Sequence, residues 1–122
     1  MAFEVQLEPK GAYIYFSGEV TYDQLKASRA QLWGNPDWDN LLFEILDFRD
    51  AASLEISTLK ASMIASMDDV ATVRSRRNKV AVIANSSNVM NFAVAYADAK
   101  KHSPWEVKIF NDLDSGRRWV CN

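Results

Sequence analysis

Residues that commonly carry chemistry or covalent cross-links are scarce in this sequence. Its 122 residues include one cysteine, Cys121, and one histidine, His102. A single thiol cannot form an internal disulfide, and no Cys/His set has the spacing of a zinc site. We therefore expect no catalytic residues, no metal and no cofactor, and a protein that is not an enzyme. Only the convergence of His102 with Asp47 and Asp50 in one cleft would reverse this expectation.

An excess of charge of one sign is also missing. The chain has 14 Lys and Arg residues against 16 Asp and Glu residues, a formal net charge of −2. Domains that bind nucleic acid by neutralising phosphates usually show a strong basic excess, so we expect no nucleic-acid partner. The apolar runs are shorter than the roughly 20 residues of a transmembrane helix, and no signal peptide is visible at the start. We expect one soluble, cytoplasmic domain spanning residues 1–122.

The first third of the chain predicts a hairpin and a helix. Alternating apolar and polar residues indicate half-buried strands at 3–7 and 12–16. Thr21 opens a capping box for a helix over residues 22–33. Gly34, followed by Asn-Pro, predicts that this helix ends on a glycine in the left-handed conformation.

The centre of the chain is an apolar run at residues 41–46. It hardly alternates, which is typical of a strand buried on both faces in a parallel sheet. An acidic corner with Asp47, Arg49 and Asp50 follows it. These three residues could form a polar site at the carboxyl end of the strand, but an ion pair and a chain turn at Asp50 explain them more simply.

A long helix is predicted from Ser57, after a weakly patterned link at 51–56. Apolar residues at helical spacing mark its expected buried face, namely Leu59, Met63, Met67 and Val70. Arg74, Arg76 and Arg77 close the pattern, where positive charge suits the end of the helix dipole.

The next predicted helix, over residues 89–101, follows a buried strand at 79–85 and is apolar nearly all round. The sheet can cover one side of such a helix only, so we expect a partner subunit, a ligand or another helix on the other side. The candidate residues for this covered face are Val89, Met90, Phe92, Val94 and Tyr96. An alternating edge strand at 105–110 and a short helix capped by Asp112 or Asp114 end the chain.

The resulting order of elements resembles the STAS superfamily, in particular its SpoIIAA-like, STAS/SEC14-domain group. The resemblance rests on four segments: Gly18-Glu19-Val20-Thr21 with Asp23; Ile45-Leu46-Asp47-Phe48-Arg49; Lys79-Val80-Ala81-Val82-Ile83; and Val107-Lys108-Ile109-Phe110 with Trp119-Val120. It implies an α/β fold with a mixed sheet of four to five strands, made of an N-terminal hairpin and parallel strands, and about four helices packed mainly on one face. It also implies a bacterial, non-enzymatic regulatory module.

In anti-sigma-factor antagonists of this superfamily, the helix after the central strand begins with a serine or threonine that is phosphorylated to release a protein partner. The nearest match here is Ile56-Ser57-Thr58-Leu59, which keeps the hydroxyls and lacks the preceding aspartate and the glycine. The resemblance therefore implies a degenerate phospho-switch at Ser57 and Thr58. A phosphate is well held at a helix N-terminus, but a plain N-cap is the commoner use of serine there.

The SEC14 side of the resemblance implies a different function, the carriage or sensing of an apolar, lipid-like ligand beside the sheet. The apolar helix at 89–101 is compatible with this ligand and equally with a homodimer. Our principal expectation is a regulatory module that binds a protein partner or itself, and the apolar-ligand carrier is the alternative. We expect the partner at the region from Asp47 to Leu59, and the candidate phosphorylation or partner-binding residues are Asp47, Arg49, Asp50, Ser57 and Thr58.

Overall fold

The computed structural model describes residues 3–54, 56–71 and 78–121. The described elements follow the order that the sequence predicted, with one additional short 3-10 helix. They are β1 (Phe3–Glu8), β2 (Gly11–Val20), α1 (Tyr22–Trp33), η1 (Trp38–Asn40), β3 (Phe43–Leu54), α2 (Thr58–Ala71), β4 (Lys79–Ile83), α3 (Ser87–Ala99), β5 (Glu106–Phe110) and α4 (Leu113–Val120).

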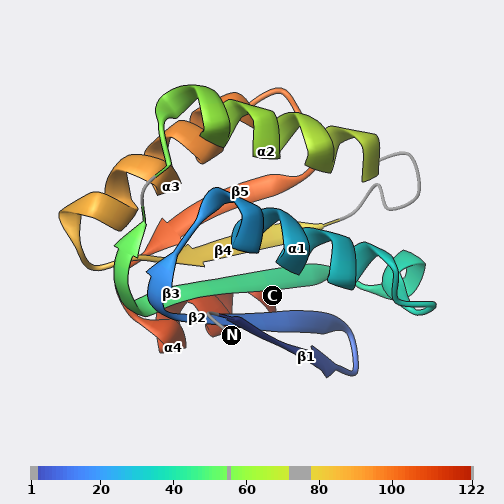
Figure 1. The fold of residues 1–122 in the computed structure, drawn as a ribbon. Coiled ribbons are helices and arrows are strands. Elements are labelled where there is room, and N and C mark those ends of the chain that lie inside the picture. The colour runs from blue at the N-terminus through green and yellow to red at the C-terminus, as the bar shows by residue number, and fades with distance from the viewer. Residues whose placement is uncertain (1–2, 55, 72–77, 122) are drawn as a thin grey trace.

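The five strands form one sheet in the order β1-β2-β3-β4-β5. β1 runs antiparallel to β2, and the remaining neighbours are parallel. Parallel neighbours need a crossover connection, which α1, α2 and α3 supply. Figure 1 shows these three helices on one face of the sheet and α4 on the other. The predicted mixed sheet, with helices mainly on one face, is confirmed.

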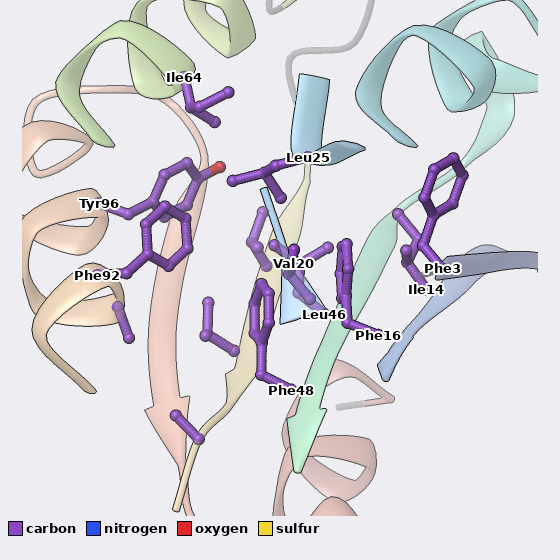
Figure 2. Packing of buried hydrophobic residues seen from close by; sticks show 14 of the residues in the cluster. Phe3, Ile14, Phe16, Val20, Leu25, Leu46, Phe48, Ile64, Phe92 and Tyr96 are labelled. Atoms are coloured by element: carbon purple, nitrogen blue, oxygen red, sulfur yellow. The ribbon is translucent and has the colours of Figure 1, made fainter. Parts of the chain in front are cut away.

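Aromatic rings fill the space between the sheet and α3. Phe16 and Phe48 are stacked with their ring centroids 4.4 Å apart. Phe92 of α3 lies 5.7 Å from Phe48 and 5.8 Å from Tyr96, again between centroids. Figure 2 shows these side chains directed into the same core. This space is where the apolar ligand was expected, and the packed rings give that alternative no support.

Two predicted helix caps are present, and a third is wrong. The Thr21 hydroxyl accepts a hydrogen bond from the Gln24 amide, and the Gln24 side chain accepts one from the Thr21 amide, which completes the capping box. Ser86 caps α3 and Asp112 caps α4. The prediction of a left-handed Gly34 is wrong, because its φ is −76° and its amide donates to the Ala30 carbonyl at 3.0 Å.

β3 is longer than the apolar run predicted, and this corrects the proposed corner. The strand continues through Asp50 to Leu54, which pairs with Val20 at the end of β2. The predicted turn at Asp50 and the link at 51–56 are therefore wrong. The last part of β3 has β2 as its only described strand neighbour, so it does not need the doubly apolar pattern of a buried strand.

The buried face of α2 also differs from the prediction. Leu59 and Met63 are 72% and 47% exposed, whereas Met67 packs against the edge of the core. The core-facing residues of α2 are instead Ala61, Ile64, Ala65 and Asp68. The hydrophobic pattern was misleading because a buried acid lies on the core side and large apolar residues lie outside. The predicted positions of Val70, Arg74, Arg76 and Arg77 fall outside the described side chains.

Candidate functional site

The start of α2 presents apolar and hydroxyl side chains to solvent. Ser57 precedes the helix, and its Oγ accepts a hydrogen bond from the Lys60 amide at 3.2 Å, which is an N-cap. Thr58, Leu59 and Met63 are exposed on the first turns of the helix. We call Thr58, Leu59 and Met63 the α2 surface. It lies at the end of the sheet where β3 delivers the chain to the helix, the usual place for function in such folds.

A polar hollow of about 210 Å³ lies beside the α2 surface. Its lining residues come from the end of β2, the start of α1 and the first turn of α2, namely Glu19, Val20, Thr21, Tyr22, Asp23 and Lys60. The Lys60 ammonium lies 5.1 Å from the centroid of the Tyr22 ring, and the Lys26 ammonium lies 4.7 Å from it. The hollow therefore combines two acids, an aromatic ring and the Lys60 cation.

A second polar group surrounds Asp47 on the α4 side of the sheet. The Arg49 guanidinium donates two hydrogen bonds to the fully buried Asp47 carboxylate, at 3.0 and 2.8 Å. The Tyr13 hydroxyl also donates to Asp47, and the Tyr15 hydroxyl donates to Asp50. The prediction that Arg49 pairs with an acid is confirmed.

The contacts of Asp47 shift two pKa values in opposite directions. Burial alone would raise the pKa of Asp47, but the hydrogen bonds from Arg49 and Tyr13 outweigh burial and leave it below its ordinary value. Burial and the hydrogen bond to Asp47 together raise the pKa of Tyr13 to about 12. A carboxylate held ionised in this way is a poor proton donor, so this group is suited to fixing β2 against β3.

The five predicted phosphorylation or partner-binding residues thus fall into two groups. Asp47, Arg49 and Asp50 hydrogen-bond within the sheet, and Ser57 and Thr58 lie at the start of α2. β3 separates the groups, because its residues 47–54 rise about 3.3 Å each and so span on the order of 20 Å. They form two sites rather than one.

The residues predicted to form a covered face on α3 are partly buried in the core and partly exposed. Val89, Phe92 and Tyr96 are buried in the core of the chain itself, and Met90 is half-buried. Val94 is 54% exposed. α2 packs against α3 and covers part of it. Another helix was one of the three alternatives expected to cover α3. A partner subunit therefore remains a prediction for Met90 and Val94 alone.

Sequence reasoning missed a buried ionic cluster between α1, β3, α2 and α3. Arg29 donates to Glu44 and Asp68, and Tyr96 donates its hydroxyl to Asp68. The Asn78 side-chain Nδ2 donates to the other oxygen of Glu44 at 2.5 Å. Burial raises the pKa of Asp68, although Arg29 acts in the opposite sense. The only sequence signal for this cluster was Glu44, an acid inside an otherwise apolar strand.

The titratable residues that could have revived an enzyme do not converge. His102 is exposed after the end of α3, at the end of the sheet where β5 begins, whereas Asp47 is level with Ile83 at the carboxyl end of β4 and Asp50 lies further along β3. Within residues 3–54, 56–71 and 78–121, no three His, Cys, Asp or Glu side chains are grouped to hold a metal ion. Over the same residues, no helix is long and apolar enough to cross a membrane.

Comparison with known proteins gives structural matches only. No family model matches the sequence, and no curated protein matches it. A DUF3478-family protein with a SpoIIAA-like fold from Shewanella loihica PV-4 is 17% identical, with a TM-score of 0.58 over 98% of this chain and 93% of that chain.

Two structures of SpoIIAA match to a similar extent. The unphosphorylated anti-sigma factor antagonist SpoIIAA is 14% identical, with a TM-score of 0.57 over 98% of this chain and 97% of that chain. The phosphorylated Bacillus cell fate determinant SpoIIAA is 14% identical, with a TM-score of 0.58 over 97% and 99%. Identities this low support the fold alone. The chain has a SpoIIAA-like fold.

Proposed function

We propose that this chain is a non-enzymatic regulatory module that binds a protein partner through the α2 surface. The observation that carries the proposal is the outward position of Leu59 and Met63, four residues apart on one helix face. Isolated exposed apolar residues are common, but two adjacent ones beside a hollow offer a continuous contact. An apolar centre with a polar rim is the usual anatomy of a protein interface.

The hollow beside α2 supplies that polar rim. Glu19 and Asp23 contribute acidic groups, and Lys60 contributes a cation that lies over the Tyr22 ring. Charges of both signs at a rim discriminate between partners more than they add affinity. We therefore assign binding energy to Leu59 and Met63 and assign partner choice to the residues of the hollow.

The hydroxyls at the start of α2 fit a phosphate-controlled version of this interaction. A phosphate on Thr58 would add close to two negative charges next to Leu59, and a helix N-terminus can hold such a group. One SpoIIAA match is described in its phosphorylated form, which makes the same chemistry worth testing here. We infer that phosphorylation at Thr58 weakens binding, because the partner's apolar surface would have to accommodate the charge. Phosphorylation of Ser57 would convert the Oγ that caps the helix into the bridging oxygen of a phosphate ester.

A cross-linking experiment in the cells of origin tests the proposal. A photo-reactive amino acid at position 63 should give a specific adduct with one protein. The same amino acid at position 42 is the matched control, because Leu42 is 48% exposed and Met63 is 47% exposed. In the chain with the probe at position 63, Leu59→Asp should abolish the adduct. An adduct that forms equally from both positions, or that survives Leu59→Asp, contradicts the proposal.

A further inference from the structure

β5 is an edge of the sheet whose outer backbone groups point away from β4. The Glu106 amide donates to the Asn78 carbonyl at 3.0 Å, and the Phe110 carbonyl accepts from the Ala84 amide at 2.9 Å. These bonds direct Glu106 and Phe110 toward β4. Because backbone groups alternate sides along a strand, Val107 and Ile109 direct their N–H and C=O groups outward. Among the described strands, β5 pairs with β4 alone.

Two hollows leave this edge accessible along its length. One, of about 440 Å³, lies at the Glu106–Lys108 end between the ends of α3 and α4. The other, of about 370 Å³, lies at the Ile109–Phe110 end between α3 and the start of α4. Figure 1 shows β5 at the edge of the sheet opposite β1. An additional strand can therefore approach β5 between the helices on the two faces.

The side chains of β5 make this edge complementary to a second copy of itself. Glu106 and Lys108 are exposed and share the α4 face, where the Lys108 ammonium lies 5.6 Å from the centroid of the Trp119 ring. In an antiparallel pair with Val107 opposite Val107, Glu106 faces Lys108 of the partner subunit, and Lys108 faces the partner's Glu106. Opposite charges directly across a strand pair are stabilising.

The backbone supports the same register. Val107 points its N–H and C=O outward, so the two copies of Val107 form a hydrogen-bonded pair that exchanges two bonds. Shifting the centre to Lys108 places two ammonium groups opposite each other, which is unfavourable. Only the Val107-centred register combines outward backbone groups at its centre with two ion pairs.

The other edge of the sheet lacks this property. β1 carries Glu4, Gln6 and Glu8 on one face, with no cation among them. No antiparallel pairing of β1 with itself can form an ion pair from these residues, and the register centred on Gln6 opposes two carboxylates. A single charge on an edge strand usually prevents edge-to-edge pairing. On β5, Glu106 and Lys108 carry opposite charges two residues apart, so the charges favour pairing with a second copy of the same strand.

We propose that β5 pairs with β5 of a second copy, in the Val107-centred antiparallel register, to form a two-fold symmetric homodimer with a continuous ten-stranded sheet. The same surface patch serves both subunits, as a two-fold interface requires. A pair of five-residue strands buries less than the roughly 800 Å² per partner of a standard interface, so the dimer is weak and concentration-dependent. Met90 lines the hollow beside Ile109, so α3 adds apolar contact at the rim. This surface is distinct from the α2 surface.

Charge reversal at the two positions tests the register directly. Lys108→Glu alone places a carboxylate opposite Glu106 of the partner subunit, and Glu106→Lys alone places two ammonium groups together. Sedimentation velocity over a dilution series should show each variant dissociating at concentrations about tenfold higher than the wild type, because two pairs change from attraction to repulsion. An equimolar mixture of the two variants should form a mixed dimer, since each then carries the charge that the other lacks.

Lys10→Glu is the matched control for Lys108→Glu, because it makes the same change in net charge at the exposed turn between β1 and β2 and should leave the dimer intact. Circular dichroism checks that every variant is folded. A wild-type chain that stays monomeric up to its solubility limit overturns the proposal. A dimer that is insensitive to both reversals also overturns it, since its interface then lies elsewhere. Failure of the dimer proposal would not affect the proposed partner binding at the α2 surface, because the cross-linking result at position 63 does not depend on β5.

Discussion

The Arg29 Nε donates a hydrogen bond to Asp68 Oδ1 at 3.0 Å, with both side chains almost completely buried. This contact joins α1 to α2, and the bond from Arg29 to Glu44 joins both helices to β3. Burying charges is costly unless they are paired, so the cluster fixes the helices in one arrangement over the sheet. The position of α2, and hence of the α2 surface, depends on it.

We predict that Arg29→Met destabilises the fold strongly. The change leaves Glu44 and Asp68 buried without their cation, and breaking a buried pair from one side typically costs about 3–5 kcal/mol. Urea denaturation followed by circular dichroism measures the loss. Lys26→Met is the control on the same helix, because Lys26 forms an exposed pair with Asp23 at 3.6 Å and should contribute less than about 1 kcal/mol. Equal losses for the two variants would contradict the structural role of the cluster.

We predict that stability falls at alkaline pH through Tyr13. Its pKa is raised to about 12 from an ordinary value of 10, so the folded chain holds this proton more tightly than the unfolded chain does. The resulting stabilisation is complete below pH 10 and is lost as the pH rises through 12. Tyr13 is partly exposed, so we expect the loss to be about 1 kcal/mol rather than the full value of the shift.

Denaturation of Tyr13→Phe between pH 8 and 12 measures this effect, because the variant should lack the Tyr13 part of the alkaline loss. Tyr22→Phe is the control, since Tyr22 lies at the start of α1, away from Asp47 and Asp50. A wild type and a Tyr13→Phe variant that lose stability in parallel up to pH 12 would show that the contact with Asp47 does not stabilise the folded state.

We predict that an alanine substitution is destabilising at Gly116 and tolerated at Gly34. A Cβ at Gly116 would lie 2.6 Å from Ile83 Cδ1, because α4 packs closely on β4, so Gly116→Ala should cost about 1–3 kcal/mol through overpacking. Gly34 has a φ of −76°, which any residue can adopt, and a Cβ there would lie 3.3 Å from the Ala30 carbonyl oxygen, a milder contact than at Gly116. Gly34→Ala should therefore change stability by less than about 1 kcal/mol. Thermal denaturation of both variants distinguishes them. A large loss of stability in Gly34→Ala would instead support the left-handed conformation that the sequence predicted for Gly34.

We predict that Ser57→Ala destabilises α2 more than Thr58→Ala does. Ser57 Oγ accepts the Lys60 amide hydrogen bond, and removing such a cap typically costs about 1 kcal/mol. Thr58 is the first helical residue, and its exposed side chain can be shortened at little cost. Hydrogen exchange of the first-turn amides of α2 reports the difference locally. If hydrogen-exchange protection of these amides is unchanged in Ser57→Ala, Ser57 does not act as the cap of α2.

Local patterns predicted most of the fold, because each element carries its own boundary signals. The capping box at Thr21, the cap at Asp112 and the apolar runs of β3 and β4 all depend on neighbours in sequence. The errors at β3 and at α2 share another cause. The extension of β3 to Leu54 depends on pairing with β2, a contact between distant segments that periodicity does not contain.

The same reason explains what was missed at the candidate site. Leu59 and Met63 fit the pattern of a core stripe, and Asp68 fits that of a solvent face. In the structure Asp68 is buried and the two apolar residues are exposed, because Asp68 pairs with Arg29 of α1 and Tyr96 of α3. Sequence alone could place hydroxyls at the start of α2, but an apolar surface beside them required the orientation of the helix.

The most direct test of the central proposal is the affinity of the cross-linked partner for the purified chain, measured by calorimetry for the wild type, Leu59→Asp and Leu42→Asp. A buried apolar contact at an interface centre typically contributes more than about 1 kcal/mol. We predict that Leu59→Asp weakens binding by about tenfold or more and that Leu42→Asp leaves it unchanged. Equal affinities for the wild type and Leu59→Asp would contradict the assignment of the α2 surface as the partner-binding site.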